Sequence, residues 1–143
     1  MRGQPVTLNT LHDVDPTGLA NGNVPVWDGT AKKYQPGTFA SSTVTLTQQS
    51  ANYTLVLADA GTQIEGTDAS AQTITVPPNS AVAFLVGTII NVCQIGAGQI
   101  TIAAGTGVTL RAPNGAKTAK QYSIIGLIKR GTDEWVISGD ATT

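Results

Sequence analysis

The chain has 143 residues, 12% of them charged, and a formal net charge of −1 at pH 7. This length suits one compact domain with an appendage rather than two full domains. The lack of excess Lys and Arg argues against a nucleic-acid partner. We also find no secretory leader and no apolar run of the roughly 20 residues that a membrane helix needs. A soluble protein is therefore expected.

Residues 1–40 are predicted to form an extended attachment arm. They contain the turn signals Asp15-Pro16-Thr17-Gly18, Asn21-Gly22-Asn23, Asp28-Gly29-Thr30 and Pro36-Gly37. Residues 24–27 and 33–35, on either side of Asp28-Gly29, predict a short hairpin.

The apolar side chains of this arm are too few for a core of their own. We expect them to be buried against another chain, which makes them candidate attachment residues: Leu11, Val14, Leu19, Val26, Trp27 and Tyr34.

Residues 41–50 are predicted to be a linker, and residues 51–143 a β domain. Strand-like alternation, punctuated by Gly and Pro, continues to the end of the chain. The candidate strands are residues 43–47, 53–57, 62–65, 72–76, 87–94, 99–103, 108–111, 122–129 and 134–138. Their spacing predicts an all-β fold, an antiparallel β-sandwich or small barrel that follows the arm.

Two groups of motifs carry a resemblance to a known class of proteins. The first is Leu11-His12-Asp13-Val14-Asp15-Pro16-Thr17-Gly18-Leu19 with Gly22, Val26-Trp27-Asp28, Lys33-Tyr34 and Pro36-Gly37. The second is Tyr53-Thr54-Leu55, Asp59-Ala60-Gly61, Thr73-Ile74-Thr75-Val76-Pro77, Val86-Gly87-Thr88, Gly96-Ala97-Gly98-Gln99-Ile100-Thr101-Ile102 and Gly131-Thr132-Asp133-Glu134-Trp135-Val136-Ile137-Ser138-Gly139-Asp140. The first group resembles a short module of tailed-bacteriophage tail fibres and other virion proteins. The second is similar to a domain of phage fibre and decoration-type proteins.

The resemblance implies a β-rich bacteriophage virion protein, a homotrimer on the particle surface that is made in the host bacterial cytoplasm. The chain has no room for the long shaft and tail-binding domain of a typical tail fibre, which favours a capsid decoration or head-fibre protein. Its arm would dock on the major capsid protein or another virion protein, and the β domain would project outward. The alternative is a short tail fibre or receptor-binding protein that contacts a host surface glycan or protein.

The single histidine, His12, is the residue on which a metal site or a catalytic triad would depend. His12, Asp13 and Asp15 are residue types that bind metal ions, and a trimer would present three copies of them. Asp15 before Pro16-Thr17-Gly18 is better explained as a turn residue, so we expect no metal site. No Gly-Xaa-Ser-Xaa-Gly motif accompanies the histidine, which argues against a Ser-His-Asp triad.

Other catalytic signals are equally weak. Gly96-Ala97-Gly98 lacks the third glycine of a nucleotide-binding loop and precedes a strand pattern, so it predicts a hairpin turn. A glycosidase needs two facing carboxylates, and most of the candidates fall in predicted turns: Asp59, Glu65, Asp68, Asp133, Glu134 and Asp140. We expect no enzyme activity and no cofactor.

The remaining side chains are interpreted as packing or as possible ligand contacts. Cys93 lies in an apolar run and is predicted to be a packed thiol, and Trp135 is predicted to be core. Tyr53 and Tyr122 begin strands and could face outward, which leaves glycan binding open without identifying its residues.

Overall fold

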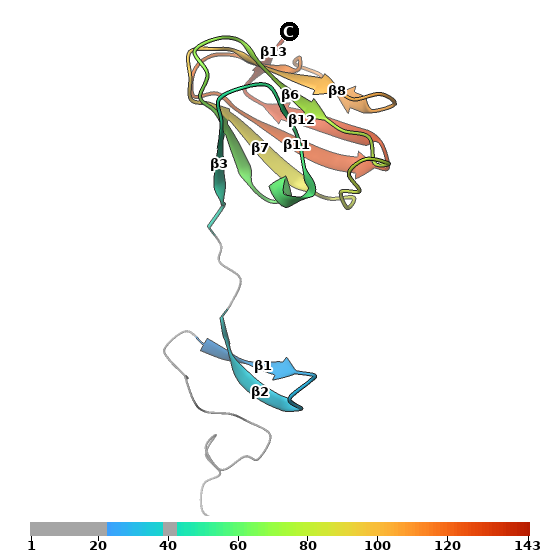
Figure 1. Ribbon diagram of the computed structural model, residues 1–143. Helices are drawn as coiled ribbons and strands as arrows, with labels where there is room; N and C mark the ends of the chain where they lie inside the picture. The colour runs from blue at the N-terminus through green and yellow to red at the C-terminus, as the bar shows by residue number, and fades with distance from the viewer. Residues whose placement is uncertain (1–22, 39–42) are drawn as a thin grey trace, which may run out of the picture. The chain divides into compact units, whose positions relative to one another are not determined.

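The computed structural model describes residues 23–38 and 43–143, and the chain divides into two compact units, residues 1–42 and 43–143 (Figure 1). In the first unit, strands β1 (Asn23–Asp28) and β2 (Lys33–Thr38) form an antiparallel hairpin, as the sequence predicts. Trp27 pairs with Tyr34 across it. Lys32 closes the turn with a positive φ of 54°, a conformation that is uncommon for a residue with a side chain.

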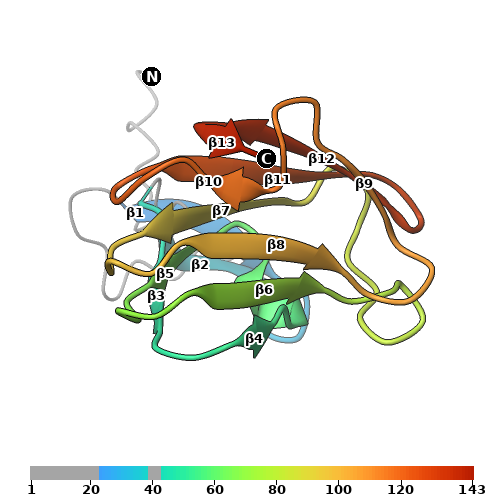
Figure 2. The same ribbon diagram turned by 90° about the horizontal axis from the view of Figure 1, so that it is seen from above.

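The second unit consists of two sheets and one short 3₁₀ helix, η2 (Leu57–Asp59). In spatial order, the six-stranded sheet contains β3 (Leu46–Gln49), β5 (Gln63–Gly66), β7 (Ile89–Gln94), β11 (Ile124–Gly131), β12 (Glu134–Gly139) and β9 (Thr109–Arg111). The five-stranded sheet contains β13 (Ala141–Thr142), β10 (Lys117–Thr118), β8 (Ile100–Ala104), β6 (Gln72–Val76) and β4 (Tyr53–Thr54). The two sheets form two layers, and Figure 2 shows β8, β6 and β4 side by side.

From β3 to β8 the chain alternates between the two sheets, and each strand lies beside the strand two places before it. The pairs β3–β5, β5–β7, β4–β6 and β6–β8 are therefore parallel. After β8 the pattern changes, because β10 pairs with β8 and β11 with β7 in antiparallel fashion. The prediction of an all-β protein is confirmed.

The prediction of an antiparallel sandwich needs correction, because both sheets are mixed. The parallel pairing β9–β12 adds to the four parallel pairs above. Alternation of apolar residues shows which side chains share a face of one strand, but it does not depend on the direction of the neighbouring strand. The prediction of a hairpin turn at Gly96-Ala97-Gly98 is also wrong, because this segment links β7 to β8, which belong to different sheets.

A single core lies between the sheets. Alternating strand residues point inward, for example Ile74 from the five-stranded sheet and Ile90 and Leu127 from the six-stranded sheet, all with no exposed surface. Trp135 is 1% exposed and packs edge to face on Phe84, with ring centroids 5.4 Å apart, so the prediction that it is core is confirmed.

The connections at one end of the two sheets stack tightly on one another. Gly96 and Gly98 lie against the backbone of residues 67–71, where a Cβ would collide with the carbonyl oxygens of Asp68 and Ser70. The Gly98 amide donates to the Asp68 carbonyl at 3.0 Å. Glycine is needed at these positions because the two backbones touch.

The second unit begins before the predicted domain boundary. Residues 46–49 fall in the predicted linker 41–50, yet they form β3, whose partner is β5. The sequence signal there was an alternating stretch, residues 43–47, next to Ser41-Ser42. In the described part of the chain no helix has the length and apolar character to cross a membrane.

Candidate interaction surfaces

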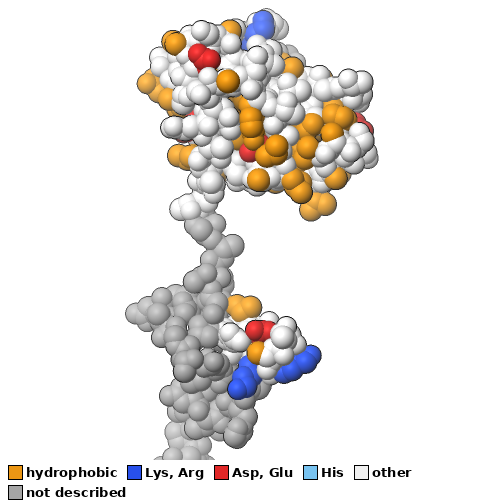
Figure 3. Space-filling view, in the orientation of Figure 1, with side chains coloured by type: hydrophobic (Ala, Val, Ile, Leu, Met, Phe, Trp, Pro, Cys, Tyr) orange, Lys and Arg blue, Asp and Glu red, His pale blue; other side chains and the backbone are white. Residues whose placement is uncertain are grey.

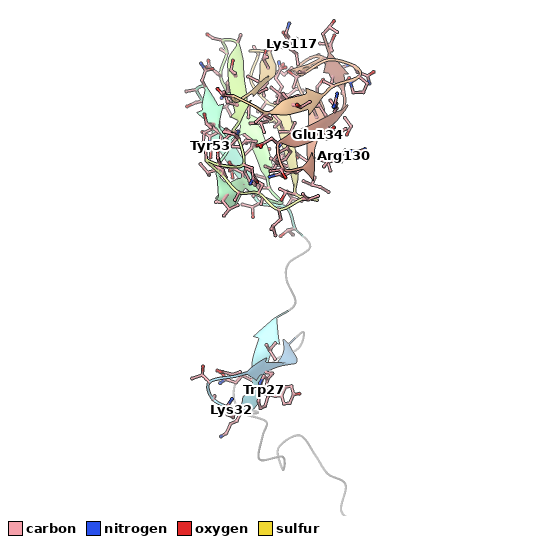
Figure 4. The ribbon with its side chains drawn as sticks, turned by 90° about the vertical axis from the view of Figure 1, so that its right-hand side faces the viewer. Trp27, Lys32, Tyr53, Lys117, Arg130 and Glu134 are labelled. Atoms are coloured by element: carbon pink, nitrogen blue, oxygen red, sulfur yellow. The ribbon has the colours of Figure 1, made fainter. Side chains whose placement is uncertain are left out.

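Two side chains predicted for attachment meet on the hairpin. Trp27 and Tyr34 are cross-strand partners whose ring centroids lie 5.2 Å apart at 63°, an edge-on aromatic contact. They remain 49% and 39% exposed. Figure 4 labels Trp27 on the hairpin. Val26 is also half exposed and lies on the other face of the hairpin, because strand residues alternate. Leu11, Val14 and Leu19 lie outside the described residues.

The turn of the hairpin is fixed by one carboxylate. Asp28 accepts hydrogen bonds from the Thr30 amide at 2.8 Å, the Ala31 amide at 3.0 Å and the Gln35 side chain at 3.0 Å. The backbone bonds from Ala31 and Thr30 lower the pKa of Asp28 below its ordinary value. None of the side chains of residues 26–35 is buried, so the pair Trp27 and Tyr34 offers its area to a partner.

The second unit carries an apolar patch that the sequence analysis did not single out. It gathers where the segments 55–62 and 77–88 join the strands, and Figure 3 shows hydrophobic side chains over this region of the unit. We define the apolar patch as Val56, Leu57, Leu85, Val86, Ile89 and Ile128, which are between 38% and 79% exposed. The detectable signal was the run Phe84-Leu85-Val86, three apolar residues in a segment too irregular for a strand.

The apolar patch continues onto the outer face of the six-stranded sheet. Ile89 pairs with Ile128, and Ile128 pairs with Val136, which places three branched side chains in one row across β7, β11 and β12. Ile124 and Leu46, 46% and 59% exposed, lie on the same face. Outer sheet faces in contact with water are usually polar, so this face differs from the expected pattern.

The outer face of the five-stranded sheet provides the comparison. Its outward residues are largely hydroxyl-bearing, and neighbouring pairs are in register: Thr54 with Thr75, and Thr73 with Thr101. Lys117 follows Thr101 in the same row. This face is largely polar, whereas the six-stranded face combines polar side chains such as Glu65 and Asn91 with the exposed apolar row.

A buried lysine holds the segment that presents Leu85 and Val86. Lys129 is 2% exposed, and its Nζ donates to the Phe84 carbonyl at 2.8 Å and to Asn79 Oδ1 at 2.5 Å. It also lies 5.9 Å from the centroid of the Trp135 ring. The backbone N–H of Asn79 in turn donates to the Asp133 carboxylate at 2.6 Å. These contacts anchor both ends of the segment that exposes the two apolar side chains.

The candidate carboxylates stabilise local structure. Asp59, 3% exposed, accepts from the Val56 amide at 2.8 Å and from the Tyr53 hydroxyl at 3.1 Å. Asp68 accepts from the Ser70 amide. Glu134 pairs with Arg111 at 2.9 Å on the surface.

The remaining acidic side chains also accept hydrogen bonds, each from different neighbours. Asp140 accepts from the Ser123 hydroxyl at 2.5 Å, and Asp133 bonds the Asn79 amide as above. Glu65 accepts two long hydrogen bonds, from Gln48 and Gln63 at 3.4 Å. Among the described residues no three His, Cys, Asp or Glu side chains gather into a group that could hold a metal ion; His12, Asp13 and Asp15 lie outside that part of the chain.

The remaining predicted side chains can be placed individually. Cys93 is a free, buried thiol, as predicted, and burial together with the neighbouring Glu65 raises its pKa. Tyr53 is half-buried and hydrogen-bonded to Asp59, so it does not face outward freely. Tyr122 is 69% exposed and faces outward freely.

Comparison of the chain with protein-family models, with curated proteins and with solved structures finds no match. The surfaces described above therefore carry the functional argument on their own.

Proposed function

We propose that this protein is a structural component of a bacteriophage particle, a homotrimeric capsid decoration or head-fibre protein. In this role the first unit attaches to the major capsid protein or another virion protein, and the second unit projects outward. The observation that carries the proposal is the hairpin of the first unit, which presents the exposed pair Trp27 and Tyr34 on a rigid turn.

The physical basis of attachment is burial of apolar surface. An aromatic side chain buries about 150–250 Å² when fully covered. Because Trp27 is about half exposed, covering it removes on the order of 100 Å² from water, which at about 25 cal/mol per Å² stabilises the complex by roughly 2–3 kcal/mol. Three linked arms in a homotrimer would multiply this contribution through their high effective concentration.

The second unit supports a scaffold role. Its buried polar groups and its carboxylates hold turns and loops, as shown for Asp59, Asp68 and Lys129. A two-layer β domain of this kind resists local opening because its core is contiguous between the sheets.

Electron microscopy of purified phage particles that contain the chain would test the proposal. The expected result is trimeric density distributed over the head in many copies. Trp27→Ala should reduce the amount of protein retained on the particles at least tenfold, while Tyr122→Ala, an exposed aromatic of the second unit, should leave retention unchanged. Failure to find the chain in purified particles would contradict the proposal.

The second candidate is a short tail fibre or receptor-binding protein. The exposed Tyr122 favours it, because exposed aromatic rings stack on sugars. In that case the density would be confined to the tail in few copies, and Tyr122→Ala would weaken adsorption to host cells.

A further inference from the structure

We propose that copies of this chain associate with one another through the outer face of the six-stranded sheet and the adjoining apolar patch. The inference deepens the proposed function and rests on it for the trimer, whereas the surface itself is argued from the described residues. The row formed by Ile89, Ile128 and Val136 would lie at the centre of the contact.

The charges on this face indicate a second copy as the occupant. Glu65 and Arg130 have opposite charge, and neither forms an ion pair with any described residue. Glu65 lies beside Cys93, near the end of β7. Arg130 lies two residues after Ile128, and Ile128 lies beside Ile89, the first residue of β7. The two charges therefore stand near opposite ends of one face.

Opposite charges at the two ends of the face suit head-to-tail contact between copies, the kind of contact that closes a cyclic trimer. In a closed assembly the Glu65 end of one copy can meet the Arg130 end of its neighbour, so each unpaired charge gains an opposite partner. Figure 4 shows Arg130 and Glu134 on the same side of the second unit, where Arg111 already neutralises Glu134 and leaves Arg130 as the available cation.

The area of the face is close to what a stable contact needs. Six strands about 4.8 Å apart, with about five residues of roughly 3.3 Å each on average, offer on the order of 500 Å². Residues of the segments 55–62 and 77–88 enlarge this area at one end. A specific interface takes about 800 Å² from each partner, so the extended face is of the required size.

The backbone that carries the most exposed apolar side chains is already held in position before binding. Leu85 and Val86 are 79% and 65% exposed, and they follow Phe84, whose carbonyl accepts from the buried Lys129. The Gly87 amide donates to the Lys129 carbonyl at 2.8 Å on the other side. Association therefore costs little backbone entropy in this segment, and such pre-organisation contributes affinity.

Sedimentation velocity of the full chain over a range of concentrations tests the inference. We expect the unsubstituted protein to associate and Ile128→Glu to raise its dissociation constant at least tenfold. The matched control is Thr75→Glu, a central-strand position on the outer face of the five-stranded sheet, which should leave the constant unchanged. Circular dichroism and urea unfolding verify that each variant is folded, and Leu85→Ser in the exposed loop serves if Ile128→Glu does not fold.

A charge exchange identifies the partner as a second copy. Glu65→Arg and Arg130→Glu should each weaken association several-fold, and the double variant should recover it to within about twofold of the unsubstituted protein. A monomer at every concentration would overturn the inference, and so would association that Ile128→Glu leaves unchanged, because that contact would belong to the first unit. The proposed function fails separately, if the chain is missing from particles while the face variants still behave as expected.

Discussion

At the scale of single residues, ionisable side chains in this protein are tuned by a few named neighbours. Asp28 in the hairpin turn and Cys93 in β7 show the two opposite effects. Backbone hydrogen bonds favour the charged form of the Asp28 carboxylate, whereas burial disfavours the charged form of the Cys93 thiol. Each shift leads to a titration that can be measured.

We predict that Asp28 titrates below 3.8, its ordinary pKa. Because the folded pKa is lowered, its contribution to the hairpin is fully present above the unfolded value and is lost as the pH falls through the folded pKa. The carboxyl carbon chemical shift of Asp28 measured by NMR against pH reports this midpoint directly. A midpoint at or above 3.8 would show that the turn bonds to Thr30 and Ala31 are absent in solution.

The Cys93 thiol should react slowly with alkylating reagents in the folded protein. Its pKa is raised above 9.0 by burial and by Glu65, so little thiolate forms at pH 8, and access is also limited. The stability linked to the protonated thiol is present below pH 9.0 and is lost as the pH rises through the folded pKa. Mass spectrometry of iodoacetamide labelling should show a rate at least tenfold lower than in urea; equal rates would contradict burial.

At the scale of elements, the stacked connections determine how the parallel strands of the second unit fit together. Gln72 Nε2 donates to the carbonyls of Gln49 and Ala51, and Thr118 Oγ1 donates to Gln94 Oε1. The Gln72 bonds tie the end of β3 and the residues after it to β6, and the Thr118 bond ties β10 to the end of β7. The glycines of the connection 95–99 allow that close stacking.

Gly98→Ala should destabilise the second unit by about 1–3 kcal/mol, because its Cβ would overlap the Ser70 carbonyl and force the two connections apart. Gly126→Ala is the matched control, since a Cβ there lies 3.5 Å from its nearest neighbour, Asn91, an ordinary contact. Urea unfolding monitored by Trp135 fluorescence measures both variants. Equal midpoints for the two would mean that the connections are not in contact.

At the scale of the whole molecule, the division at residues 42 and 43 separates a small hairpin unit from a β domain with its own core. A hairpin of two strands is marginally stable on its own, whereas the two sheets bury a continuous set of side chains. The two units should therefore respond independently to substitution.

We predict that Ile90→Ala lowers the unfolding free energy of the β domain by about 2–5 kcal/mol, because Ile90 has no exposed surface. Trp27→Ala should leave this transition unchanged, and the double variant should equal Ile90→Ala to within about 0.5 kcal/mol. Calorimetry of the four proteins measures the coupling. A larger coupling would show that the hairpin and the β domain unfold as one unit.

Much of the local structure was predictable from the sequence. The hairpin around Asp28-Gly29 and the inward position of Trp135 follow from turn chemistry and from alternation, both properties of neighbouring residues. The burial of Cys93 was predicted from its apolar neighbours, whereas alternation places its side chain on the outer face, beside Glu65 and Ile124. One further signal was available: Thr73-Ile74 recurs as Thr101-Ile102, and these pairs lie side by side in β6 and β8.

Only the tertiary structure decided which strands are partners and which faces meet water. The alternation from Ile89 to Gln94 is the same whether β7 runs parallel or antiparallel to its neighbours. The parallel pairing of the strands from β3 to β8 could therefore not be derived from it. The exposure of Leu85 likewise depends on Lys129, distant in sequence, which holds the segment outward. Sequence thus determined the inward and outward sides of individual strands, because that pattern is local, while pairing and exposure depend on contacts between distant residues.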